Sequence, residues 1–243
     1  MVTNMIGSIR TSSASDAPVR PLRAIDLGMT TYSEAWDLQN MIAQEVASGH
    51  VSETLLLLEH PHTYTCGRRG GRDHILATEQ QLKEDGIVVL DVDRGGDVTY
   101  HGPGQLVAYP IINLHNYGTI DYPGYVRTLE RVLIAALKEM GVDAHTLKDY
   151  SGAWVRGPVG EEKIAAIGVR VDGRGITTHG IALNVNTDLR FFEYIVPCGI
   201  TDKGVTSMAC ILPEVQSMFE AKDTFARHFA NVFGFRLPES GDA

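Results

Sequence analysis

The stretch KIAAIGVRVDGRGITTHGIALNV, residues 163–185, carries the strongest signal of the fold. Two apolar runs with the composition of β-strands lie on either side of Asp-Gly-Arg-Gly at 172–175. Turn residues between two such runs are typical of a β-hairpin. An antiparallel hairpin in a chain with few long helices predicts an α+β fold, built as one domain around a large mixed β-sheet flanked by helices.

Three longer helices are predicted around this sheet. Thr31 and Glu34 have the spacing of a capping box and open a helix that ends near Gly49. Asp121 precedes a second, amphipathic helix. A last helix spans about residues 219–233, and its phenylalanines are expected to face the core.

The remaining extended segments complete the predicted sheet. TLLLL at 54–58 is a short apolar run of the kind that forms a central strand. Proline lacks the backbone donor that a sheet interior requires, so Pro110 places its own strand toward a sheet edge. Further strands are expected at residues 22–27, 63–66, 87–90, 106–112 and 152–155.

A single domain accounts for most of the chain. The 243 residues, 44% of them hydrophobic, suffice for one domain with a substantial core, which we place at residues 22–238. Residues 1–21 are rich in Ser, Thr and Ala and lack the apolar segment of a signal peptide, so a disordered N-terminal extension is expected. No apolar run approaches the roughly 20 residues of a membrane span. These features predict a cytoplasmic protein.

The charge balance limits the classes of partner. A net charge of −9 argues against nucleic acid, which binds basic faces, and against an anionic membrane surface. The three scattered cysteines, Cys66, Cys198 and Cys210, do not form a disulfide framework. A reducing compartment is therefore expected.

Cys198 is the first candidate for a chemical role. It lies in FFEYIVPCGI, residues 191–200, between Pro197 and Gly199. Such flanks predict a rigid turn with open backbone N–H groups, where a thiolate would act as a nucleophile beside an oxyanion site. The alternative is a buried cysteine that packs as a small hydrophobic residue.

Lys163, at the start of the hairpin, is the second candidate. A lysine in this place is either a solvated end residue or a functional amine. An ammonium group beside Cys198 would lower the pKa of the thiol from its usual value of about 8.5. Low-dielectric surroundings would also make the amine release its proton more readily, so the pair would act as acid and base in turn.

The segment DRGGDVTYHGPGQ, residues 93–105, is the other dense group of polar residues and glycines. Its glycines allow the backbone to approach a ligand closely. The segment lacks the ending of a phosphate-binding P-loop, and Gly102-Pro103-Gly104 lacks the third glycine of a dinucleotide fingerprint. A ligand cradle and a structural turn are equally compatible with this pattern.

Other histidines and cysteines have simpler interpretations. His179 is interpreted as a hydrogen-bonded core histidine, with a catalytic histidine as the alternative. Cys210 is expected in the core, and Cys66, beside a basic loop, is a reactive candidate that has no partner in the sequence. No metal site is predicted at His60, His62, Cys66 and His74, because their spacing matches no zinc pattern.

Six segments, taken together, resemble one enzyme family. They are LLLLEHPHTYTCGRRG, DRGGDVTYHGPGQLVAYPI, SGAWV, KIAAIGVRV, THGIALNV and VPCGI. In this order they are similar to the lipoyl(octanoyl) transferases of protein lipoylation, from about residue 22 to near the C-terminus. The resemblance implies the single-domain fold of the biotin and lipoate ligases.

The resemblance also implies an activity. An octanoyl group would pass from octanoyl-acyl carrier protein to a lysine of a lipoyl domain, through a thioester on Cys198. Lys163 would lower the pKa of the Cys198 thiol and act as acid and base. The implied acceptors are the lipoyl domains of 2-oxoacid dehydrogenase E2 subunits and the glycine cleavage H protein. No cofactor or metal is implied, and a monomer is favoured.

The same resemblance implies a set of substrate-binding residues, whose glycines (Gly95, Gly96, Gly168 and Gly180) would leave space for an aliphatic chain. The implied set is Arg94, Gly95, Gly96, Asp97, Val98, Thr99, Tyr100, His101, Ala166, Ile167, Gly168, Gly180, Ile181 and Ala182. Acyl carrier proteins and lipoyl domains are typically acidic, and so is this chain, so docking requires a local basic patch. The expected patch is Arg68, Arg69, Arg72 and Arg94.

Two other functions fit parts of the sequence. GRRGG at 67–71 resembles the glycine–arginine loop of biotin ligases, so an ATP-dependent lipoate or biotin ligase on the same fold is one alternative. Such an enzyme would need ATP but no nucleophilic cysteine, and would survive Cys198→Ala. A non-catalytic module that binds acyl groups or carrier proteins is the other alternative, and it would leave no covalent acyl group.

Overall fold

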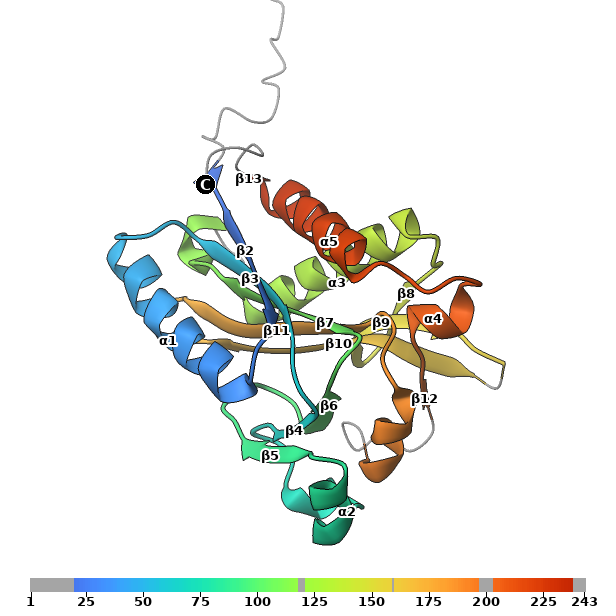
Figure 1. The fold of residues 1–243 in the computed structure, drawn as a ribbon. Helices are drawn as coiled ribbons and strands as arrows, with labels where there is room; N and C mark the ends of the chain where they lie inside the picture. The colour runs from blue at the N-terminus through green and yellow to red at the C-terminus, as the bar shows by residue number, and fades with distance from the viewer. Residues whose placement is uncertain (1–19, 118–120, 159, 197–202, 238–243) are drawn as a thin grey trace, which may run out of the picture.

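An eight-stranded mixed sheet forms the centre of the computed structural model (Figure 1). The structure describes residues 20–117, 121–158, 160–196 and 203–237. The strands follow the order β2-β3-β7-β11-β10-β9-β8, and β12 pairs in parallel with β10. The predicted hairpin is confirmed as the antiparallel pair β10 and β11. The bounds are β2 Arg23–Met29, β3 Thr54–Glu59, β7 Gln105–Ile111, β8 His145–Leu147, β9 Tyr150–Arg156, β10 Glu161–Val171, β11 Thr177–Asn184 and β12 Gly204–Val205.

Two smaller sheets complete the strand arrangement. The three-stranded sheet has the order β5-β4-β6, with β4 Thr63–Cys66, β5 Val88–Asp91 and β6 Val98–His101. β1 Arg20–Pro21 pairs in parallel with β13 Phe235–Arg236. The ordered domain therefore includes Arg20 and Pro21, just before its predicted start at residue 22. Residues 1–19 lie outside the described residues, so the extension expected there stays a prediction.

Helices cover both faces of the large sheet (Figure 1). α1 Tyr32–Ser48 packs on one face, and α3 Tyr122–Glu139 and α5 Met218–Phe233 pack on the other. As predicted, Phe225, Phe229 and Phe233 of α5 are buried. None of the described helices is long and apolar enough to cross a membrane. The short helices are α2 Glu79–Glu84, α4 Met208–Ile211 and the 3-10 turns η1 Arg72–His74, η2 Leu114–Tyr117 and η3 Leu189–Tyr194.

The predicted helix starts are confirmed by their capping hydrogen bonds. The Thr31 hydroxyl accepts from the Glu34 N–H, and the Glu34 carboxylate accepts from the Thr31 N–H. Gly49 ends α1 with a φ of 75°, a left-handed conformation that glycine adopts without a steric penalty. The Asp121 carboxylate caps α3 by accepting from the Gly124 N–H. Local sequence therefore determines where these helices begin.

Pro110 lies inside the sheet, so its predicted place near an edge is wrong. β7 runs between β3 and β11, and its paired residues on the β11 side end at Ala108, opposite Ile181. Beyond that pair, the Thr177 hydroxyl donates to the Pro110 carbonyl and accepts from the Ile112 N–H. A side chain thus replaces ladder hydrogen bonds at the place where proline has no N–H to donate.

We expect Thr177→Val to lower the free energy of unfolding by about 1–3 kcal/mol, because valine keeps the shape of threonine but leaves the buried Ile112 N–H without that acceptor. Urea denaturation measures the change. The matched control is Thr178→Val, at a neighbouring buried threonine whose hydroxyl makes no hydrogen bond within the described chain. An equal loss of stability in the two variants would contradict this account of Pro110.

Candidate functional site

Two adjoining cavities are lined by strands of the large sheet and by β6 of the three-stranded sheet. The free volume of the first cavity is about 30 Å³ and that of the second about 40 Å³. Both cavities are narrow, since small-molecule sites typically measure roughly 300–1,000 Å³. The cavities share Thr99, Ala166 and Ala182 as lining residues, so they adjoin one another.

Small residues of the central hairpin form the surface that the two cavities have in common. Ala166 of β10 pairs with Ala182 of β11, and Gly168 pairs with Gly180. Alternate residues of a strand share a face, so these four residues form one strip, which we call the small-residue strip. The strip lies on the side of the sheet that α1 covers, since Ala182 packs in the same cluster as that helix.

The glycine at position 180 has a structural cause. A Cβ there would lie 2.0 Å from the Ala108 carbonyl oxygen, so any side chain would force β7 and β11 apart. At Gly168 a Cβ would lie 3.1 Å from Arg94 Cδ and 3.2 Å from the Gly95 carbonyl oxygen. Close packing of neighbouring backbones therefore requires glycine at 180, beside any room that it leaves for a ligand.

Most of the predicted substrate-binding residues come together at the second cavity. Those that line it are Arg94, Gly95, Gly96, Thr99, His101, Ala166, Ile167, Gly168, Gly180, Ile181 and Ala182. The other three do not line either cavity. Val98 and Tyr100 are fully buried in the core of the three-stranded sheet. Asp97 accepts hydrogen bonds from the Val98 N–H and from the ring of His74.

Lys163 reaches the first cavity because of a β-bulge. Lys163 pairs with Trp154 of β9 and Ala165 pairs with Ala153, and the register shifts between the two pairs. Trp154 and Ala153 are neighbours and point to opposite faces, so Lys163 and Ala165 do too, although a regular strand would place them on one face. The Lys163 Nζ lies 4.8 Å from the centroid of the Trp154 ring, within cation–π range.

Cys198 lies outside the described residues, within the segment 197–202. The described chain resumes at Lys203, which lines the first cavity together with Lys163. The Lys203 Nζ lies 4.8 Å from the centroid of the Tyr150 ring. The chain that follows Cys198 therefore reaches the cavity of Lys163, and the meeting of Cys198 with Lys163 stays a prediction.

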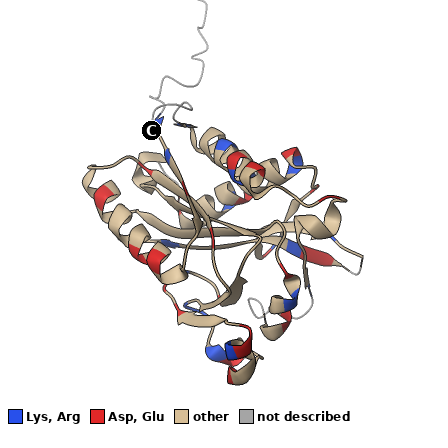
Figure 2. Cartoon of the chain, viewed as in Figure 1, with Lys and Arg blue, Asp and Glu red and all other residues tan. Residues whose placement is uncertain are grey.

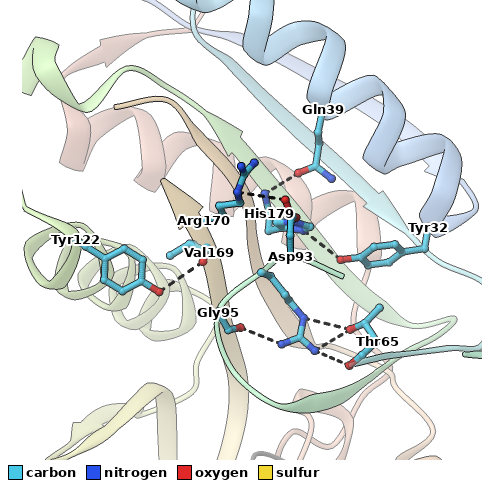
Figure 3. A network of polar contacts seen from close by, with 10 residues as sticks. Tyr32, Gln39, Thr65, Asp93, Gly95, Tyr122, Val169, Arg170 and His179 are labelled. Atoms are coloured by element: carbon cyan, nitrogen blue, oxygen red, sulfur yellow. Dashed lines mark hydrogen bonds and ion pairs between the residues drawn. The ribbon is translucent and has the colours of Figure 1, made fainter. Parts of the chain in front are cut away.

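A hydrogen-bonded series of Asp93, His179 and Tyr32 lies at the second cavity (Figure 3). His179 Nε2 is 2.7 Å from Asp93 Oδ1, and its Nδ1 is 3.1 Å from the Tyr32 hydroxyl. The hydrogen bond from His179 lowers the pKa of Asp93, so the carboxylate accepts from Nε2–H. Burial lowers the pKa of His179, so its ring is neutral and Nδ1 accepts from the tyrosine. The interpretation of His179 as a hydrogen-bonded buried histidine is confirmed.

The backbone of His179 adopts an unusual conformation. Its φ is 57°, in the left-handed region that few residues other than glycine adopt. Its N–H donates to Gln39 Oε1 of α1 at 2.6 Å (Figure 3). Strand alternation would place His179 on the core face with Ile181 and Leu183. The left-handed conformation turns the ring to the other face, where it meets Tyr32.

Two further histidines beside this series are neutral at pH 7. His60 Nδ1 is 2.7 Å from the Thr30 carbonyl oxygen, which only accepts, so the neutral ring carries its hydrogen there and Nε2 accepts from the Tyr109 hydroxyl. His101 Nδ1 is 2.8 Å from Gln105 Oε1. Burial lowers the pKa of His60 to about 4 and the pKa of His101 well below its usual value.

Arg94 is buried and fixes the loop before β6. Its guanidinium donates to the Thr65 carbonyl and hydroxyl and to the Gly95 carbonyl (Figure 3). The Gly95 N–H donates in turn to the Val169 carbonyl, so the loop is tied to both sheets. The predicted place of Arg94 in an exposed docking patch is therefore wrong. The other members of that patch are exposed, namely Arg68, Arg69 and Arg72.

The two described cysteines have no place in the site. Cys66 is buried, and burial raises the pKa of its thiol, the opposite of what a reactive thiolate requires. Cys210 was expected in the core, but it is exposed on α4. Among the described residues there is no cluster of three or more His, Cys, Asp or Glu side chains that could hold a metal ion.

Three aromatic residues of the site carry no distinguishing signal in the sequence. Tyr32 begins a helix, and Tyr109 and Trp154 belong to apolar strand patterns that would equally describe core residues. Only the pairing of distant strands and the bulge in β10 bring them to the cavities. Strand alternation in β7 gives a partial signal for Tyr109, because Tyr109 lies on the same face of the strand as the polar residue Gln105, which lines the first cavity.

The fold and the family model identify the class of protein. Residues 31–230 match the model of the lipoyl protein ligase A/B catalytic domain. A bipartite lipoate protein ligase from Thermoplasma acidophilum has a TM-score of 0.64 at 17% identity, covering 91% of this chain and 87% of its own. The structure of lipoate-protein ligase A bound with ATP has a TM-score of 0.61 at 17% identity, covering 91% of this chain and 88% of its own. The chain is thus a lipoyl protein ligase A/B catalytic domain, and the predicted fold is confirmed.

Closer relatives narrow the class to one family. The octanoyltransferase of Chloroflexus aggregans is 46% identical over 218 residues, which are 90% of this chain and 97% of that protein. The octanoyltransferase of Solibacter usitatus is 46% identical over 211 residues, 87% of this chain and 92% of that protein. The chain belongs to the lipoyl(octanoyl) transferase family and is an acyltransferase.

We expect His60→Gln to weaken the loss of stability at low pH. The unfolded chain takes up a proton at His60 near pH 6.5, whereas the folded protein takes it up only near pH 4. The unfolded state therefore binds more protons between these values, and the free energy of unfolding falls as the pH drops through this window. The variant should reduce that slope by up to about 1.4 kcal/mol per pH unit.

Urea denaturation at a series of pH values measures the slope. The matched comparison is His50→Gln, which removes an exposed imidazole in place of the buried one. A slope that is identical in wild type and in His60→Gln would contradict the buried, neutral state of His60.

Proposed function

We propose that this enzyme transfers an octanoyl group from octanoyl-acyl carrier protein to the lysine ε-amine of lipoyl domains, through a thioester on Cys198. The observation that carries the proposal is the position of Lys163, at a cavity that adjoins a second cavity along the small-residue strip. The octanoyltransferase names of the relatives support the acyl group. The expected acceptors are the lipoyl domains of 2-oxoacid dehydrogenase E2 subunits and the glycine cleavage H protein.

In the first half-reaction, the Cys198 thiolate attacks the thioester carbonyl of the donor. A C–S bond forms to Cys198, and the bond to the carrier thiol breaks. The leaving thiolate takes the proton of the Lys163 ammonium, so the step ends with an acyl-enzyme, a neutral carrier thiol and a neutral Lys163. The backbone N–H groups near Cys198 and Gly199 are our candidates for holding the oxyanion.

In the second half-reaction, the ε-amine of the acceptor lysine attacks the Cys198 thioester. A C–N bond forms and the C–S bond breaks, while the neutral Lys163 takes the proton of the amine. The products are the amide, the Cys198 thiolate and the Lys163 ammonium, which is the starting state. The ring of Trp154 beneath Lys163 favours the ammonium form in this cycle.

The cavities suit an aliphatic group. The small-residue strip leaves open space along the hairpin, and the histidines beside the second cavity are neutral and hydrogen-bonded within the protein. An acyl chain placed there would meet no charged imidazole. An ATP-dependent ligase on the same fold is the competing function, and it differs in needing ATP and no cysteine nucleophile.

The decisive test is intact mass spectrometry after mixing the enzyme with octanoyl-loaded acyl carrier protein. We expect one octanoyl adduct, which is absent in Cys198→Ala because the nucleophile is missing. The adduct should form slowly in Lys163→Ala, because the charge that stabilises the thiolate is lost.

The matched control is Cys210→Ala, which removes an exposed thiol outside the cavities and should keep the adduct. Transfer to a lipoyl domain should occur without ATP. Turnover at the wild-type rate by Cys198→Ala, or a requirement for ATP, would favour the ligase instead.

Docking of an acidic carrier protein requires positive charge on a chain whose net charge is −9. Figure 2 shows acidic residues on α1, α2 and α5, with basic residues on α2 and α5 as well. The exposed Arg68 and Arg69 lie in the loop between β4 and η1. Their backbone N–H groups bond to the loop that lines the second cavity. We therefore place carrier docking at this loop.

Charge reversal tests this docking site. The double variant Arg68→Glu/Arg69→Glu should raise KM for the acyl carrier protein about tenfold at low salt, with a smaller effect on kcat, because rim charges act mainly on association. Arg23→Glu, at an exposed position of the edge strand β2, is the matched control and should leave KM unchanged. An unchanged KM in the double variant would exclude the loop as the docking site.

A further inference from the structure

The two cavities follow each other along the strands. On β7, Gln105 lines the first cavity and Tyr109 lines the second. On β11, Asn184 lines the first and Gly180 the second, and Gln105 pairs with Asn184. In both strands the two residues are four positions apart, or about 13 Å along the strand. Lys163 therefore lies at one end of the two adjoining cavities, and Tyr109 lies at the other.

Three aromatic rings lie at this second end, and we call them the end wall: Tyr32, Tyr109 and His179. The Tyr32 ring lies 6.5 Å from the Tyr109 ring and 6.4 Å from the His179 ring, and the Tyr109 and His179 rings are 6.3 Å apart, measured between centroids. All three residues are buried and all three line the second cavity. The mutual contacts make them one packed group.

The polar atoms of the end wall are bonded within the protein. The Tyr32 hydroxyl bonds to His179 Nδ1, and the Tyr109 hydroxyl bonds to His60 Nε2. His179 Nε2 bonds to Asp93. A ligand that reaches the wall therefore meets aromatic carbon, against which a hydrocarbon end packs well and past which it has no room to extend.

The wall is also maintained at a cost in backbone strain. His179 has a left-handed backbone conformation, and it forms hydrogen bonds with Gln39, Asp93 and Tyr32 in that conformation. Strained residues of this kind cluster at functional sites, where the surrounding structure fixes one geometry. The strain turns the His179 ring toward the end of the cavity, and a regular strand would leave that place open.

We propose that the end wall sets the longest acyl chain that this enzyme accepts, and that Tyr32 determines the limit. The inference rests on the proposed function, which puts the thioester near Lys163 and the methyl end of the chain at the wall. Tyr32 is the member that belongs to α1, whereas the other two belong to strands. Behind it lies Trp36, which is partly exposed and contacts both Tyr32 and His179. A shorter residue at 32 would thus lengthen the cavity toward Trp36.

The test measures acyl-enzyme formation by intact mass with hexanoyl, octanoyl, decanoyl and dodecanoyl donors on acyl carrier protein. In Tyr32→Leu, the ratio of the dodecanoyl rate to the octanoyl rate should rise at least about tenfold over wild type, since one methylene in a closed pocket is worth a factor of that order. Tyr32→Phe should keep the wild-type ratio, because the ring remains. A thermal melt of each variant verifies that it is folded.

Tyr109→Leu removes a second ring of the wall and provides the answer if Tyr32→Leu does not fold. It should shift the ratio in the same direction. Adducts that form with the wild-type chain profile in the leucine variants would overturn the inference and leave the proposed function standing. No adduct from any donor in the wild type would overturn the proposed function and the end wall with it.

Discussion

The site depends on strand alternation in the central hairpin and on two departures from it. Regular alternation puts Ala166 and Ala182 on the face toward α1 and puts the larger Val169 and Leu183 in the core on the α3 and α5 side. This arrangement alone produces an open strip on one face of a close-packed sheet. It also means that any large side chain at the strip needs an irregular backbone to reach it.

The two departures lie at opposite ends of the cavity. The bulge between Lys163 and Ala165 turns the lysine out of the core face, and a left-handed residue does the same for His179. Each is supported by its neighbours. Gly152, with a φ of 112°, allows the Ala165 carbonyl to approach, since a Cβ there would lie 2.3 Å from that oxygen. Gln39 accepts the N–H of His179. The fold thus uses local irregularity to place one amine and one ring on the same surface.

The sequence predicts the parts of this structure that local patterns encode. The capping box at Thr31, the cap at Asp121 and the hairpin turn at 172–175 are local signals, and the structure confirms them. The prediction that Pro110 lies near a sheet edge is wrong because Thr177, which is 67 residues away, compensates for the N–H that proline lacks. The prediction that Cys210 lies in the core is also wrong, because an apolar stretch does not reveal which of its residues face solvent.

The resemblance to a family, rather than any pattern in composition, identified in advance most of the residues that line the second cavity. Arg94 illustrates the limit of that information. It belongs to the cavity, as the resemblance implies, but its guanidinium bonds to Thr65 inside the protein and is not available for a surface patch. A motif indicates which residues gather at a site, and only the tertiary structure shows which of their atoms are already engaged.

The fold alone does not separate a ligase from a transferase. The solved neighbours at 17% identity include lipoate ligases, one of them with ATP bound, whereas the relatives at 46% identity are octanoyltransferases. An adenylating enzyme must hold a nucleotide beside the acyl carboxylate, whereas a transferase must bring a donor thioester, a thiol and an amine together in succession. The space needed beside the lysine therefore differs between the two chemistries. In this chain Lys203 and the aromatic rings of Trp154 and Phe192 line the cavity at Lys163. Side chains on one scaffold, and not the scaffold itself, thus decide which acyl chemistry it performs.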